Sequence, residues 1–208
     1  MLSNNKNGSV GRKLFYIPIV HTETDMGALS ESVKKASLQK MGLQDWKRKK
    51  QIIGRFWNDI EKAINNLNLP YSRTKIYQDG LPVCEGGKEL EIVNQLASTG
   101  SRNHELLDKL IRKGATLMGS ESPDLLVMEY NLAMNTFNNP TSSLKGEDMK
   151  IQSAEILKKR DEFIAKRIND TLKDGEVGVL LIGLLHNVVP LLDVDIEVVT
   201  PIAPNTAS

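Results

Sequence analysis

Cysteine is almost absent from the sequence, which contains only Cys84. A disulfide within the chain is therefore impossible, and this is typical of proteins from a reducing compartment such as the cytoplasm. An excess of charge of one sign is also missing, since 27 basic and 26 acidic residues leave a net charge of +1. Such a chain produces no strong field toward nucleic acid or an anionic membrane, and we expect neither as a partner.

Long apolar runs are missing as well. The most apolar stretch, residues 177–192, is interrupted by His186, Asn187 and Pro190. It is too short for a membrane span, which needs about 20 apolar residues. The first dozen residues lack the apolar centre of a signal peptide. We therefore expect a cytoplasmic protein with no membrane segment.

The common catalytic and nucleotide-binding motifs are absent. There is no GxGxxG after the first predicted strand and no GxxxxGK[ST], the usual signals for dinucleotide and P-loop phosphate binding. There is also no GxSxG nucleophile elbow and no HExxH zinc motif. Cys84 has no activating base near it in the sequence. If the chain is an enzyme, the groups that carry the chemistry must come from distant parts of the sequence.

The pattern of apolar residues predicts a mostly parallel, open α/β sheet with helices on both faces. Residues 14–20 and 177–183 are continuous apolar runs, which are typical of strands covered on both sides. Pro18 cannot donate to a sheet ladder, so the first strand should have an edge or a bulge at that point. The other predicted strands are 74–77, 115–118 and 196–199, and the predicted helices are 27–40, 43–68, 88–99, 103–113, 123–137 and 147–174. One domain should span residues 12–200, with flexible tails at 1–11 and 201–208.

Polar residues follow the predicted strands at their carboxyl ends. Right-handed crossovers place all these ends on one edge of a parallel sheet, where ligands bind in open α/β folds. His21 follows the first strand and His186 the fourth, whereas His104 opens a helix and is expected at the surface. If the segment after His21 stays extended, Glu23 and Asp25 share its face. The remaining candidates at this edge are Gln78, Asp79, Ser120 and Glu121.

An arginine is predicted to reach the same edge. A strand of seven residues spans about 23 Å at 3.3 Å per residue, and a helix covers that length in about 15 residues. Counting back from Asp174 along the preceding helix reaches Arg160. This residue borders the apolar stripe that contains Leu157 and Ile164. A surface ion pair is the alternative role for Arg160.

The stretch from Lys159 to Ile168, KRDEFIAKRI, together with Val179 to His186, VLLIGLLH, resembles the TraB/Tiki-like superfamily. That group takes in erythromycin-esterase-like and ChaN-like proteins. The resemblance implies two GxxH motifs, an arginine-bearing helix before the second motif, and acidic residues nearby. The second motif here is Gly183-Leu184-Leu185-His186, and the first is Pro18-Ile19-Val20-His21, with proline in place of glycine. Members are assigned metal-dependent proteolysis, ester hydrolysis or haem binding.

The leading hypothesis is a hydrolase acting on a small-molecule or peptidic substrate. His21 and His186, with Glu23 or Glu121, would activate water directly or hold a divalent metal such as zinc, manganese or iron. The predicted metal ligands are His21, His186 and Glu23. Arg160 would stabilise an oxyanion or an anionic substrate. The alternative is a non-catalytic α/β module that binds a small anionic ligand or a partner protein.

Overall fold

A computed structural model describes residues 11–25, 30–138 and 143–202. Its centre is a parallel sheet with the strand order β3-β2-β4-β1-β5. The predicted α/β fold with a mostly parallel sheet is therefore confirmed. The predicted tails lie almost entirely outside the described residues. The strands are β1 (Arg12–Ile19), β2 (Thr74–Gln78), β3 (Thr116–Met118), β4 (Val177–Gly183) and β5 (Ile196–Val199).

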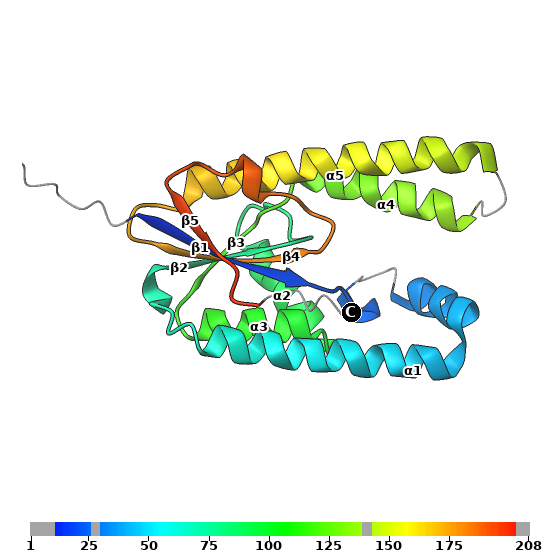
Figure 1. Cartoon of the computed structure of the whole chain (residues 1–208), viewed down its shortest axis with the longest axis horizontal. Coiled ribbons are helices and arrows are strands. Elements are labelled where there is room, and N and C mark those ends of the chain that lie inside the picture. The colour runs from blue at the N-terminus through cyan, green and yellow to red at the C-terminus, as the bar shows by residue number, and fades with distance from the viewer. Residues whose placement is uncertain (1–10, 26–29, 139–142, 203–208) are drawn as a thin grey trace, which may run out of the picture.

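Helices cover both faces of this sheet (Figure 1). On one face lie α1 (Ser30–Asn65), α2 (Lys88–Ser98) and α3 (Arg102–Arg112), and on the other lie α4 (Pro123–Asn138) and α5 (Ser143–Thr171). The two helices predicted over 27–40 and 43–68 are joined in α1, which is kinked at Gly42, where φ is 79°. Within the described residues, no helix is long and apolar enough to cross a membrane.

The side chains of β4 alternate between two covered faces of the sheet, which explains why its sequence is apolar throughout. Val179 and Leu181 pack in the core beneath α1, α2 and α3, whereas Leu180 and Ile182 pack against α5. Successive side chains of a strand point to opposite faces, so a strand covered on both sides needs an apolar residue at every position. The central strand β4 pairs with β1 on one side and β2 on the other, which brings the ends of three strands together.

Pro18 is tolerated because β5 is short. Although β1 lies between β4 and β5, β5 pairs only with Arg12 through Phe15. Pro18 therefore lies beyond the part of β1 that β5 covers, although it remains opposite Ile182 of β4. This open side provides the local edge that the sequence predicted, on a strand that is otherwise interior.

The length of α5 carries it past the sheet. Its 29 residues span about 43 Å at 1.5 Å per residue, whereas a seven-residue strand covers about 23 Å. Ile151 near its start is 55% exposed, while Ile164 and Ile168 are fully buried. Arg160 lies between these two parts of the helix, level with the carboxyl ends of the strands.

Candidate functional site

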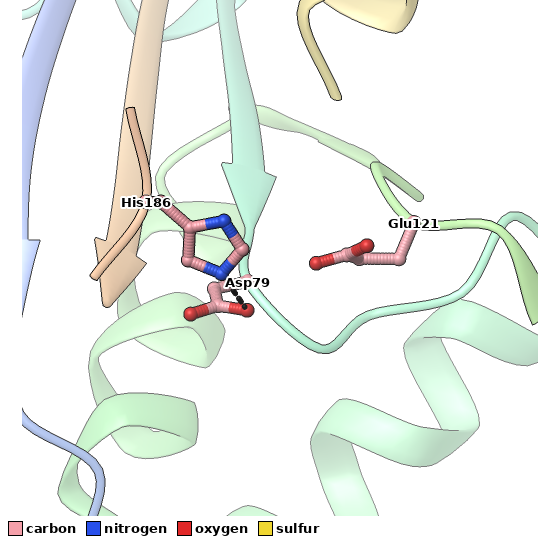
Figure 2. A group of neighbouring side chains, drawn as sticks. All are labelled: Asp79, Glu121 and His186. Carbon is pink, nitrogen blue, oxygen red and sulfur yellow. Dashed lines mark ion pairs between the residues drawn. The ribbon is translucent and has the colours of Figure 1, made fainter. Parts of the chain in front are cut away.

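The side chains that follow the strands do meet at one edge of the sheet. Asp79 comes directly after β2, Glu121 lies three residues after β3, and His186 lies three residues after β4. Figure 2 shows these three side chains grouped beside the ends of β2 and β4. His21, two residues after β1, joins them through Asp79. The expectation of a common edge therefore agrees with the structure.

Asp79 is the centre of the group. Its Oδ2 lies 2.9 Å from Nε2 of His21 and accepts a 2.8 Å hydrogen bond from the Gly183 amide. Its Oδ1 lies 3.4 Å from Nε2 of His186. Burial alone would raise the pKa of Asp79, but the hydrogen bonds from His186 and His21 hold that pKa well below its usual value. One carboxylate thus connects the two histidines.

Arg160 is saturated by carboxylates. Its Nη2 donates to Oδ1 of Asp79 and to Oε1 of Glu121, each at 2.6 Å, and its Nε donates to Oε2 of Glu121 at 3.2 Å. Its Nη1 donates to both oxygens of Glu129, at 2.7 and 2.8 Å. All three nitrogens of the guanidinium thus donate to carboxylates. An oxyanion in the substrate would therefore compete with three carboxylates for Arg160.

His186 lies between two carboxylates. Its Nδ1 is 2.5 Å from Oδ1 of Asp161, and its Nε2 faces Asp79. The amide of Asn187 donates to the other oxygen of Asp161 at 3.0 Å. Burial lowers the pKa of His186, but Asp79 and Asp161 together raise it above its usual value. Both ring nitrogens face acceptors, so the charged imidazolium is the form that satisfies this position.

His21 is the accessible member of the group. A third of its side chain is exposed, compared with 4% for His186. Nε2 of His21 donates a hydrogen bond to Asp79, and among the described contacts Nδ1 has no partner. Burial lowers the pKa of His21, but the hydrogen bond to Asp79 raises it above the usual value. The neutral ring therefore carries its proton on Nε2 and leaves the Nδ1 lone pair available.

The Gly183-to-His186 motif forms a turn that folds His186 back over the strand end. The His186 amide donates to the carbonyl of Gly183 at 3.1 Å. Gly183 also needs to be glycine, because a Cβ there would lie 2.8 Å from Oδ2 of Asp79. The motif thus combines an amide that binds Asp79, free space for that carboxylate, and a histidine that returns to it.

Glu23 lies apart from the group. Residues 23–25 form a 3-10 turn rather than the extended segment that the sequence predicted, so the expected common face of His21, Glu23 and Asp25 is wrong. Oε1 of Glu23 accepts a 2.8 Å hydrogen bond from Nε1 of Trp46 on α1. The structure therefore does not bring Glu23, a predicted catalytic residue and metal ligand, together with the histidines.

His104 is buried, which corrects its predicted place at the surface. Only 6% of the residue is exposed, and its Nδ1 lies 2.7 Å from the hydroxyl of Ser101. Burial lowers the pKa of His104 to about 4. It is therefore a neutral core histidine in the first turn of α3, a helix whose N-cap is Ser101.

Three members of the group could hold a metal ion. Asp79, Glu121 and His186 each offer one ligand atom, and these atoms lie within 4.8 Å of one another. Arg160, however, already donates to the carboxylates of Asp79 and Glu121. Since a guanidinium and a divalent cation repel each other, an ion at this position would have to displace Arg160.

Sequence reasoning selected His21, His186, Arg160 and Glu121, and the structure places all four in one network. It gave no role to Asp161 or Glu129, which bind His186 and Arg160. Asp161 had a local signal, since it adjoins Arg160 on a helix that passes the sheet edge. Glu129 has none, because its contact depends on how α4 packs against α5.

The histidines give a pH-dependent prediction. His186 has a raised pKa, so it contributes stability below its unfolded value of 6.5, and this contribution is lost as the pH rises through the folded value. The difference in unfolding free energy between wild type and His186→Asn should therefore decrease from pH 5.5 to pH 9, measured by urea unfolding.

His104→Asn is the control, for which we expect a pH dependence of opposite sign. Because the pKa of His104 is lowered to about 4, the corresponding difference should increase with pH up to 6.5. Equal slopes for the two variants would contradict the assignment.

Comparisons of the whole chain with protein-family models, with curated proteins and with solved structures find no match.

Proposed function

We propose that the chain is a hydrolase in which His21 is the general base. The observation that carries this proposal is the Asp79–His21 pair. A buried carboxylate accepts from Nε2 of a partly exposed imidazole whose Nδ1 has no partner among the described contacts. A carboxylate that binds one ring nitrogen fixes the tautomer of the imidazole, and the other ring nitrogen can then act as a general base.

In the proposed reaction, Nδ1 of His21 takes a proton from a water molecule as its oxygen attacks the substrate carbonyl. The imidazolium that forms is stabilised by Asp79, which remains ionised because its pKa is low. Arg160 keeps Asp79 in place and offsets the negative charge of Glu121. His21 then returns the proton to the leaving group, which completes the hydrolysis.

The charge of the group favours neutral or cationic substrates. Four carboxylates, one guanidinium and two imidazoles meet here, so the negative groups outnumber the positive ones even when both histidines are charged. This balance weighs against the alternative of a module that binds small anions. Small-molecule esters and amides, or peptides, are the substrate classes that remain. Membership of the TraB/Tiki-like superfamily, which the GxxH resemblance suggests, stays a proposal, and it selects the same two histidines.

Hydrolysis should depend on His21 without depending on stability. We expect His21→Asn to abolish the activity of the purified protein on a panel of neutral aryl esters, aryl amides and short peptides. The melting temperature should change little, because a third of the side chain is already exposed. Glu162→Gln is the matched control, since Glu162 lies on α5 near Arg160 with its side chain 55% exposed. Activity that survives in His21→Asn, or a wild type that is inactive on the whole panel, would refute the proposal.

A metal-dependent hydrolase is the second candidate, supported by the Asp79, Glu121 and His186 group. One imidazole and two carboxylates with open positions suit zinc, manganese or iron, which would activate the water. The same assay separates the two candidates. The histidine-base proposal expects activity to survive EDTA, whereas activity that EDTA removes and one metal equivalent restores would favour the metal-dependent enzyme.

A further inference from the structure

Asp25 is a buried acid outside the proposed catalytic pair. Its side chain is only 2% exposed. Its Oδ2 accepts from the amide of Thr22 at 2.6 Å and from the hydroxyl of Thr22 at 2.9 Å. Its Oδ1 accepts from the hydroxyl of Ser101, the N-cap of α3. One side chain therefore joins the segment after β1 to a helix that is distant in sequence.

The protons of this contact can be assigned. The Ser101 hydroxyl gives its proton to Asp25, so Nδ1 of His104, 2.7 Å from the same oxygen, must donate to it. With its pKa lowered to about 4, His104 is neutral and carries its proton on Nδ1. The Ser101 oxygen also accepts from the His104 amide at 3.3 Å. The hydroxyl is thus fully used as donor and acceptor.

Asp25 forms no ion pair with a lysine or an arginine among the described contacts. Nδ1 of His104 lies 3.9 Å from its Oδ1 but belongs to a neutral ring, whereas the charge of Asp25 helps to raise the pKa of His21. Hydroxyls, an amide and the positive end of the α3 dipole hold this side chain instead. Burying a carboxylate away from lysine and arginine costs stability and is tolerated mainly where the group is useful.

The neighbouring residue gives Asp25 a use. His21 directly precedes Thr22, whose amide and hydroxyl Asp25 binds. Among the described contacts, the side chain of His21 has only one hydrogen-bond partner, Asp79. The direction of its ring therefore depends on the backbone that Asp25 fixes.

We propose that Asp25 is a positioning residue, which docks the turn at residues 22–25 onto Ser101 and thereby holds His21 against Asp79. The inference rests on the proposed role of His21 as a base. Its test does not require a substrate, so that it can fail or succeed independently of the hydrolase proposal.

The test measures the exchange with water of the Nε2 proton of His21 in protein labelled with ¹⁵N-histidine. The chain has only three histidines, so few ring signals occur, and His21→Asn identifies the one of interest. In wild type, the hydrogen bond to Asp79 should slow this exchange. In Asp25→Asn and in Ser101→Ala, exchange should become at least tenfold faster, because each change removes acceptors or donors that fix the turn.

Arg102→Met is the control for general destabilisation of α3. Arg102 donates to the carbonyl of Gly54 at 2.8 Å and pairs with Glu61 at 3.1 Å, which links α3 to α1 without involving Asp25. The Arg102→Met variant should have a lower melting temperature, and its His21 Nε2 proton should exchange as slowly as in wild type. Unchanged exchange in Asp25→Asn or in Ser101→Ala, whichever variant folds, would overturn the proposal. So would equally fast exchange in Arg102→Met.

Discussion

Replacing Arg160 with methionine should destabilise the protein by about 3–5 kcal/mol, because it leaves buried carboxylates without their cation. Glu121 is fully buried and Asp79 is 5% exposed, and both lose their strongest hydrogen bonds with the guanidinium. A loss of this size lowers the melting temperature by on the order of 10 °C for a chain of this length. Thermal unfolding followed by circular dichroism at pH 7 measures it.

Two further variants show whether the effect comes from unpaired charge. Arg112→Gln removes an exposed i,i+4 pair with Asp108 and should not change the midpoint measurably. Adding Glu121→Gln to Arg160→Met should recover part of the lost stability, since the neutral amide costs less to bury than the unpaired carboxylate. An Arg160→Met protein as stable as wild type would mean that Arg160 is not the counter-ion of this network.

The substitution Gly183→Ala should disturb the site with the smallest possible change in volume. The added Cβ would lie 2.8 Å from Oδ2 of Asp79, closer than such atoms can approach without movement. Forcing an extra carbon into a packed position costs about 1–3 kcal/mol. Because the same oxygen binds His21, the carboxylate must shift away from its histidine. We expect loss of hydrolysis together with a lower melting temperature.

Gly54→Ala is the matched control for Gly183→Ala. Gly54 lies inside α1, and a Cβ there would meet nothing within 4 Å. Alanine in a helix interior is favoured over glycine by about 0.5–1 kcal/mol, so this variant should be as stable as wild type or more stable. A Gly183→Ala protein that behaves like Gly54→Ala would show that Asp79 moves aside without consequence.

The sequence was sufficient for the sheet and for the position of Arg160. A short apolar run such as 177–183 is well satisfied as a strand that helices cover on both faces. The different rises per residue of a helix and a strand placed Arg160 at the sheet edge. The prediction that Glu23 shares a face with His21 was wrong because the direction of a side chain after a strand depends on the turn that follows. A 3-10 turn at residues 23–25 directs Glu23 to Trp46 instead.

Other features of the site depend on packing that no local pattern contains. His104 begins a helix, where an exposed position is common, and it is buried because α3 docks beside the turn that carries Asp25. Asp79 was one of four acidic candidates at the sheet edge. Its central position follows from His21 and from the Gly183-to-His186 motif, which supplies both the Gly183 amide and the second histidine, so that two segments distant from Asp79 in the sequence contribute.

The pairing of the first strand with β4 has a consequence for how the protein is made. Arg12 in β1 binds Asp195 at 2.6–2.7 Å across a separation of 183 residues, and both strands beside β1 come from the last part of the chain. Ribosomes add about 5–20 residues per second, so β1 waits on the order of ten seconds or more for its neighbours. Contacts of this range also carry a large loop-closure entropy, which makes them late steps in folding. His21 therefore reaches Asp79 only after β4 has been synthesised, and a ribosome-bound chain that ends before β4 should lack the pair altogether.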